Sequence, residues 1–228
     1  MSSTNKKIAI IGGGVAGLLA AVTAADAGAK VSLFEKMPKV GLKMGITGKG
    51  RCNLTNSAPI MDFIGKTPGN GKFLYSAYEA FSNEDLLDLL HSYGLVTKVE
   101  RGGRVFPASD DAQEVRHLFM KLLRDKKVDL HLEEPVSHIV VIDGEAKGVV
   151  TAKGRYDTNA VILCTGGASY PRTGSTGDGY RMAKEVGHKV TTIRPALIPL
   201  VCQEDWCKEL QGLSLKNVIL SLDGGGRR

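Results

Sequence analysis

The first apolar segments of the chain are separated by a glycine turn and an alanine-rich stretch. Residues 7–11 form a short apolar run of the kind found in fully buried strands. Residues 15–27 are rich in alanine and leucine and end at Gly28, which predicts a helix with a glycine at its C-terminal cap. Residues 30–35 predict a second strand. A strand, turn, helix and strand in about 30 residues have the size of a right-handed crossover between parallel strands.

The pattern changes after the second strand. Residues 37–71 are rich in Gly, Pro, Asn, Thr and Lys without a sustained period, which predicts a long loop. Helices are predicted over 72–81, 84–93 and 112–126, the second with Ser82 and Asp85 at the spacing of a capping box. Residues 128–132 predict a third parallel strand, and residues 179–186 a last helix.

Short alternating runs then predict an antiparallel meander over 136–142, 146–152 and 155–159, with turns at Asp143-Gly144 and Lys153-Gly154. Residues 160–164 are continuously apolar and return to the buried sheet. The order of these predicted strands and helices indicates an α/β fold, with a Rossmann-type domain over residues 1–194 in which a parallel sheet is combined with a β-meander. Residues 195–228 predict the beginning of an inserted β-rich substrate domain, with a strand over 215–222 and no returning partner.

Charge and cysteine content restrict the classes of function. The net charge is +6, but five basic residues and no acidic one fall between residues 36 and 61, within the glycine-rich loop. Basic helices with interleaved aromatics are missing, so we expect no nucleic-acid partner. The apolar run 8–29 contains four glycines by Gly17, then Thr23 and Asp26, so we expect no membrane span. Four cysteines without a CxxC pair or metal-ligand spacing predict a reduced, cytoplasmic protein without a metal site.

The turn after the first strand has the spacing GxGxxG. Gly12 can form the turn, Gly14 can let a pyrophosphate approach the backbone, and Gly17 can let helix and strand pack closely. Val15 and Ala16 begin the helix, whose N-terminal amides favour an anion. Glu35 follows the second strand, where a carboxylate can accept hydrogen bonds from a ribose. The alternative is a glycine turn that serves packing alone, with a solvated glutamate.

The basic loop favours FAD over NAD, since a plain NAD unit proceeds directly to a helix. Its cations and glycine-exposed amides suit two phosphates and a ribityl chain, although a solvated surface loop has the same composition. A second glycine turn, Thr165-Gly166-Gly167, follows the apolar run 160–164 at the carboxyl edge of the sheet, where ligands of open α/β sheets bind. It can equally be a tight strand-to-loop turn.

The acid or base that would act at a flavin is not assigned by the sequence. The five histidines (His91, His117, His131, His138 and His188) are interpreted as surface or packing residues. Tyr170, Arg172 and Thr173 are better candidates for the flavin neighbourhood, where a cation can stabilise the charge of reduced flavin. Cys52 is interpreted as a buried structural thiol rather than a redox thiol, because no second cysteine is near in sequence.

Taken together, these motifs resemble the BaiN/RdsA-type flavoproteins, also described as YhiN-like or aminoacetone oxidase-like NAD(P)/FAD-dependent oxidoreductases. The resemblance covers nearly the whole chain. Its most specific part is the stretch from Gly50 to Asn56, Gly-Arg-Cys-Asn-Leu-Thr-Asn; the other parts are residues 12–17, Glu35-Lys36, residues 41–49, Cys164 to Gly167 and Thr176 to Tyr180. It implies a Rossmann-type FAD-binding domain of the two-dinucleotide type. It also implies a longer protein whose C-terminal segment returns to cover the flavin, so we expect this chain to be an N-terminal portion.

The resemblance implies roles for residues along one bound FAD. Glu35 would bind the adenosine ribose, Val136 would offer backbone to the adenine, and the loop from Lys43 to Asn53 would line the pyrophosphate and flavin. The full predicted set is Gly12, Gly14, Val15, Ala16, Gly17, Glu35, Lys36, Lys43, Thr47, Arg51, Cys52, Asn53, Leu54, Val136, Thr165, Gly166, Gly167 and Asp178. We expect an FAD-dependent oxidoreductase that exchanges electrons with NAD(P)H and a small-molecule substrate. The alternatives are a non-catalytic FAD-binding fragment and an NAD-binding dehydrogenase.

Overall fold

The computed structural model describes residues 6–195, 201, 203–213, 215, 218, 219 and 221. The chain divides into two compact units, Met1–Val190 and Thr191–Arg228. The first contains the two core clusters and nearly all of the regular structure.

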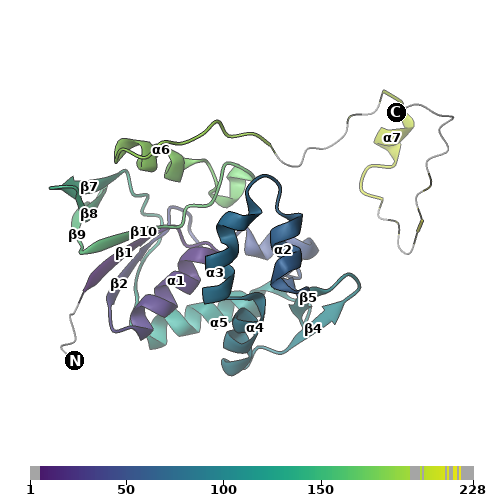
Figure 1. The fold of residues 1–228 in the computed structure, drawn as a ribbon, viewed down its shortest axis with the longest axis horizontal. Helices are drawn as coiled ribbons and strands as arrows, with labels where there is room; N and C mark the ends of the chain where they lie inside the picture. The colour runs from purple at the N-terminus through teal and green to yellow at the C-terminus, as the bar shows by residue number, and fades with distance from the viewer. Residues whose placement is uncertain are drawn as a thin grey trace. The chain divides into compact units, whose positions relative to one another are not determined.

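The centre of the first unit is a four-stranded parallel sheet (Figure 1). Its strands are β1 (Lys7–Ile11), β2 (Lys30–Phe34), β6 (Asp129–His131) and β10 (Ala160–Leu163), in the order β10-β1-β2-β6. Strand β2 pairs with one edge of β1, and β10 pairs with its other edge. The direction in which strands are added to the sheet therefore reverses beside β1. This reversal is the place where open α/β sheets bind ligands, at the carboxyl ends of the strands. The predicted Rossmann-type α/β fold is confirmed.

Two helices cover one face of the sheet. They are α1 (Val15–Asp26) and α5 (Ala112–Asp125), and both contribute to the larger core cluster with Ile10, Val31 and Leu33 of the strands. The side chain of Asp111 accepts a hydrogen bond of 2.8 Å from the amide of Gln113 and so begins α5. The apolar stripe predicted for this helix packs on the sheet, as expected.

The meander and a short helix cover the opposite face. Strands β7 (His138–Ile142), β8 (Glu145–Thr151) and β9 (Gly154–Asp157) pair antiparallel, as the turn residues predict. Helix α6 (Asp178–Glu185) lies on the same side. Because successive strand residues point to opposite faces, Ala9 and Ile11 of β1 pack here, with Val149 and Met182, while Ile10 packs under the helices.

The segment between β2 and α5 contains more structure than its sequence predicts. The expected loop over 37–71 includes a 3₁₀ turn η1 (Met44–Gly50), a short strand β3 (Thr55–Asn56) and a helix α2 (Ile60–Lys66). The helix predicted over 72–81 is a 3₁₀ turn η2 (Gly71–Leu74) followed by α3 (Tyr75–Ala80), and α4 (Asn83–Ser92) has the predicted capping box. A hairpin of β4 (Thr97–Glu100) and β5 (Arg104–Pro107) was not predicted.

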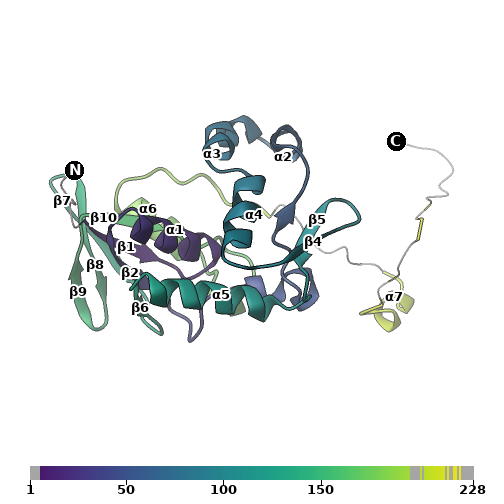
Figure 2. The same cartoon turned by 90° about the horizontal axis from the view of Figure 1, so that it is seen from below.

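In both views these added elements lie at the end of the first unit opposite the meander (Figures 1 and 2). Strand β5 is central in a second sheet of order β3-β5-β4, which is antiparallel throughout. The basic loop is therefore tied by β3 to a hairpin about 50 residues further along the chain.

The second unit has one regular element among its described residues, the helix α7 (Trp206–Glu209). The strand predicted over 215–222 falls mostly outside the described residues, and the β-rich domain from residue 195 stays a prediction. No helix in the part of the chain that the structure describes combines the length and apolarity needed to span a membrane.

Candidate functional site

Each of the three motif positions has a different structural reason for being a glycine. Gly12 has a φ of 106°, and a Cβ there would lie 2.5 Å from the carbonyl oxygen of Cys164. A Cβ on Gly17 would lie 1.8 Å from the carbonyl oxygen of Gly12, so this glycine is required by the packing of α1 against the turn. Around Gly14, in contrast, a Cβ would meet nothing within 4 Å. The space beside Gly14 is open to a ligand.

The start of α1 leaves its amides for an external acceptor. Gly14 is the N-cap and supplies no side-chain cap, and the first turn contains no acidic residue. The N–H groups of a first helical turn have no partner within their own helix, and the helix dipole makes that end positive. This combination favours a phosphate at the turn.

Glu35 is held at the carboxyl end of β2 by two backbone amides. Its Oε2 accepts from the amide of Gly13 at 2.7 Å, and its Oε1 accepts from the amide of Met37 at 2.8 Å. The carboxylate therefore has a fixed position beside the glycine turn. This is the position from which a ribose hydroxyl can be bound.

The basic loop turns back toward the glycine turn. Gly41 donates its amide to the carbonyl oxygen of Gly13 at 2.8 Å, which fixes the beginning of the loop. Cys52 is buried, and burial raises the pKa of its thiol to about 11, against a smaller lowering by a hydrogen bond with Thr47. Such a thiol is protonated at neutral pH, which supports the structural interpretation of Cys52 over a redox role.

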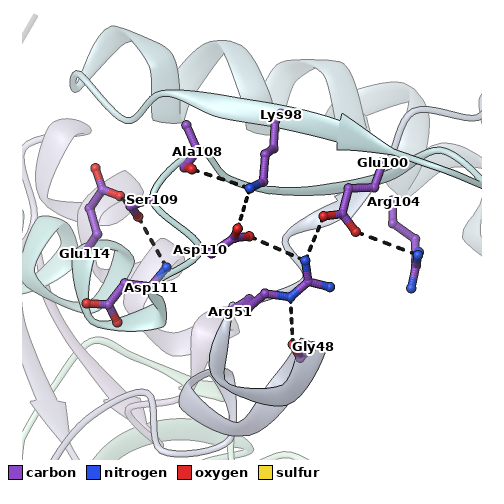
Figure 3. A network of polar contacts seen from close by, with 10 residues as sticks. All are labelled: Gly48, Arg51, Lys98, Glu100, Arg104, Ala108, Ser109, Asp110, Asp111 and Glu114. Atoms are coloured by element: carbon purple, nitrogen blue, oxygen red, sulfur yellow. Dashed lines mark hydrogen bonds and ion pairs between the residues drawn. The ribbon is translucent and has the colours of Figure 1, made fainter. Parts of the chain in front are cut away.

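The side chain of Arg51 points from this loop toward Glu100 and Asp110 (Figure 3). Its guanidinium lies 4.1 Å from the ring centre of Phe106, and Nη1 is 2.7 Å from Glu100 Oε1 and 3.4 Å from Asp110 Oδ1. These contacts tie the loop to the β4–β5 hairpin. Arg51 does not line the cavity that the other predicted loop residues share.

The segment after β10 is bonded to Lys36, which follows β2. The Nζ of Lys36 donates to Asp178 Oδ2 at 2.6 Å and also to the hydroxyl of Thr176. The hydrogen bond from Lys36 lowers the pKa of Asp178, with burial acting against it and Thr176 adding to the lowering. This ion pair joins the end of β2 to the N-terminus of α6.

The glycine turn, the basic loop and the segment after β10 all line one cavity, which has a volume of about 1130 Å³. This is above the range of roughly 300–1,000 Å³ typical of sites for drug-sized ligands. Of the predicted site residues, Arg51, Gly17 and Gly167 do not line it. Those that do are Gly12, Gly14, Val15, Ala16, Glu35, Lys36, Lys43, Thr47, Cys52, Asn53, Leu54, Val136, Thr165, Gly166 and Asp178.

Sequence reasoning missed a buried carboxylate in the wall of this cavity. The side chain of Glu134 is 1% exposed, and it accepts hydrogen bonds from Thr151 Oγ1 (2.8 Å), Tyr156 Oη (2.7 Å) and Lys153 Nζ (2.7 Å). Nδ1 of His131 lies 3.2 Å from its Oε2. Burial alone would raise the pKa of Glu134, but these bonds outweigh it and lower the pKa to about 2. The sequence does not distinguish the buried Glu134 from the exposed Glu133 beside it, so only the fold reveals this carboxylate.

Lys39 also lines the cavity and was not singled out, although it belongs to the basic loop. Tyr170, Arg172 and Thr173 line a second, smaller cavity, and Thr173 lines both. No group of His, Cys, Asp or Glu within the described residues could hold a metal ion.

Comparison with known proteins gives relatives along nearly the whole chain. A 3-dehydro-bile acid delta(4,6)-reductase from Clostridium scindens is 38% identical over 201 residues, covering 85% of this chain and 47% of that protein. A ribosomal RNA dihydrouridine synthase from Escherichia coli is 29% identical over 224 residues, covering 94% of this chain and 54% of that protein. The chain thus spans about half the length of the curated relatives it matches.

A solved structure shares the fold. THI4 from Thermovibrio ammonificans superposes with a TM-score of 0.53 at 17% identity, covering 81% of this chain and 64% of that one. The family model described as "HI0933-like protein Rossmann domain" matches residues 6–225. The resemblance to the BaiN/RdsA-type family is confirmed by these matches, and the protein belongs to the HI0933-like Rossmann-domain family.

Proposed function

We propose that the chain binds FAD in the large cavity and forms the cofactor-binding part of an oxidoreductase. The observation that carries the proposal is the shared wall: the glycine turn, Glu35 and the basic loop, which are separate in sequence, face one space. A dinucleotide with a flavin needs such a continuous path for its ribose, pyrophosphate and ribityl groups. Bound FAD would supply the hydride chemistry, which belongs to the cofactor.

The donors and acceptors of the cavity suit this ligand. The open space at Gly14 and the uncapped start of α1 suit a pyrophosphate, and the fixed carboxylate of Glu35 suits the adenosine ribose. Val136 and the backbone around Thr165 would contact the remaining parts of the cofactor. Lys43 and Lys39 give the loop side a positive charge that favours the phosphates.

The electron partner is part of the proposal. We infer that NAD(P)H and a small-molecule substrate exchange electrons with the flavin, and the name of the Clostridium scindens relative, a reductase, supports reductive chemistry. The Escherichia coli relative is named for action on ribosomal RNA. Lys36, Lys39 and Lys43 from the basic loop line the cavity, which supports a phosphate-bearing cofactor as their partner.

The test begins with the purified chain and the identity of any cofactor released on denaturation. FAD affinity is then measured by titration for the wild type, for Glu35→Ala and for Glu133→Ala, a control at an exposed carboxylate. We expect Glu35→Ala to weaken binding by about 1 to 3 kcal/mol, because bonds from the ribose to a carboxylate are charge-assisted.

Three outcomes distinguish the alternatives. Anaerobic bleaching of the bound flavin by NADH or NADPH would support the oxidoreductase, whereas FAD binding without bleaching would favour a non-catalytic FAD-binding chain. Binding of NAD in place of FAD would favour the dehydrogenase. Equal FAD affinity in wild type and Glu35→Ala would contradict the assigned site.

A further inference from the structure

A second cavity, with a volume of about 500 Å³, adjoins the first. Leu42 and Thr173 line both cavities, so the two spaces share a wall. The volume is within the range of roughly 300–1,000 Å³ that small-molecule sites occupy. The remaining lining residues are Ile46, Tyr170, Pro171 and Arg172.

Most of this lining is apolar and accessible. Tyr170 is 67% exposed and Ile46 is 49% exposed, although both are large hydrophobic side chains. Apolar side chains that gather in a concave place, with a few polar groups among them, are characteristic of ligand sites. The face of a tyrosine ring also favours stacking against a flat ligand.

The loop that carries Tyr170 is held in an unusual conformation. Tyr170 has φ 57° and ψ 62°, a left-handed conformation that is uncommon outside glycine and recurs at functional sites. Its carbonyl oxygen accepts from both the amide (2.9 Å) and the hydroxyl (2.7 Å) of Thr173. Lys43 donates to the carbonyl oxygen of Ser169 at 2.9 Å, and its Nζ lies 5.9 Å from the centre of the Tyr170 ring. These contacts hold the backbone of the loop at Tyr170, and Lys43 lies over its ring.

Arg172 is the charged residue in this lining. Among the residues that the structure describes, its side chain has neither a hydrogen bond nor an ion pair. Arg51, by comparison, is paired with two carboxylates. A guanidinium without a protein partner, in the lining of a mostly apolar cavity, suits a carboxylate that it can bind through two parallel hydrogen bonds.

We propose that the second cavity is the substrate site and takes a flat apolar molecule that carries a carboxylate. The ring system stacks on Tyr170 between Ile46 and Pro171, and the carboxylate pairs with Arg172. The role as substrate site rests on the proposed function, since it requires that the adjoining cavity holds FAD. The binding chemistry itself depends only on the lining.

The experiment uses 2-naphthoate as the flat anionic probe and 2-naphthamide as its neutral counterpart. Each is titrated by calorimetry against the whole chain, with and without added FAD. We expect 2-naphthoate to bind with one-to-one stoichiometry. Arg172→Gln should weaken its binding at least tenfold and leave 2-naphthamide unchanged, and Tyr170→Leu should weaken both probes. Arg101→Gln, at an exposed arginine on the β4–β5 turn, is the matched control and should change neither.

Two results would overturn the inference. One is equal binding of 2-naphthoate by the wild type and Arg172→Gln. The other is Arg172-dependent binding of uridine 5′-monophosphate that is tighter than the binding of 2-naphthoate, which would identify the ligand as a nucleotide and not a flat carboxylate. The two proposals fail separately. If the wild-type chain binds 2-naphthoate through Arg172 but does not bind FAD, the proposed function and the role as substrate site are contradicted, while the carboxylate-binding chemistry of the second cavity stands. If the chain binds FAD but shows no Arg172-dependent binding of 2-naphthoate, this inference alone is contradicted. A change in the flavin absorption band when 2-naphthoate binds would support the adjoining position.

Discussion

Replacing Glu134 by alanine is expected to destabilise the first unit strongly. The carboxylate joins the segment after β6 to the meander through Thr151, Lys153 and Tyr156, all at 2.7 to 2.8 Å. Without the carboxylate, the hydroxyls of Thr151 and Tyr156 lose their acceptor, and a buried donor without a partner costs about 1 to 3 kcal/mol. The side chain of Lys153 is 64% exposed and can return to water, so it adds little, and we expect a total loss of about 3 kcal/mol.

The pH dependence of this loss follows from the pKa of Glu134. Because the pKa in the folded chain, about 2, is below the ordinary value of 4.5, the native state favours the ionised carboxylate. Its contribution to the free energy of unfolding is complete above the ordinary pKa and disappears as the pH falls from about 4.5 to about 2. The difference between wild type and Glu134→Ala should therefore be largest near pH 7 and shrink below pH 4.5.

Urea unfolding followed by circular dichroism measures both effects. Titrations at pH 7 and pH 3 are compared for the wild type, Glu134→Ala and Glu133→Ala, whose exposed carboxylate is the adjacent residue. We expect Glu133→Ala to stay within about 0.5 kcal/mol of the wild type, as surface substitutions usually do. Equal unfolding free energies for the two variants at pH 7 would refute the assignment of a stabilising network to Glu134.

Three further substitutions or treatments test other parts of the site. Gly17→Ala places a Cβ 1.8 Å from the backbone oxygen of Gly12, so we expect a loss of about 3 kcal/mol or more in urea unfolding; a wild-type midpoint would contradict it. Because the pKa of Cys52 is about 11, iodoacetamide at pH 7 should label it slowly until urea unfolds the chain, and rapid labelling of the folded chain would be inconsistent with that pKa. Arg51→Met keeps apolar contact with Phe106 but removes the ion pairs, so the unfolding midpoint should fall while FAD affinity, measured by titration, stays the same.

The parts of the fold that the sequence predicts are those with a regular apolar pattern. The strands around Ile10 and Leu33 are buried on both faces, which requires continuous apolar runs, and α5 has one apolar stripe. The meander is marked by turn residues such as Asp143, which has a φ of 52°. In each case the signal is local, because the physical requirement falls on neighbouring residues.

The β4–β5 hairpin lacks such a pattern. Val99 is 61% exposed, and the strands are held by charged side chains such as Arg104, whose Nη2 lies 3.7 Å from Glu100 Oε2. Helix α2 has only seven residues, too few for a helical period to stand out from the surrounding loop. Elements of this kind are stabilised by residues that are distant in sequence. The spacing of apolar residues within the element does not indicate which distant residues those are.

Arg51 shows how a missed element changes the interpretation of a site. The sequence predicts that both Lys43 and Arg51 of the loop face the cofactor, and Lys43 does line the cavity. Arg51 instead pairs with Glu100 of the hairpin and stacks on Phe106 beside it, which are residues that become neighbours only when β4 and β5 form. The composition of a basic loop indicates that it can bind an anionic ligand. Carboxylates elsewhere in the chain can, however, pair with the same cations. The hairpin therefore decides that Arg51 serves the fold and not the ligand. Removing the carboxylate of Glu100 would still leave Arg51 beside Asp110 and Phe106, so it would not add a charge to the cavity wall.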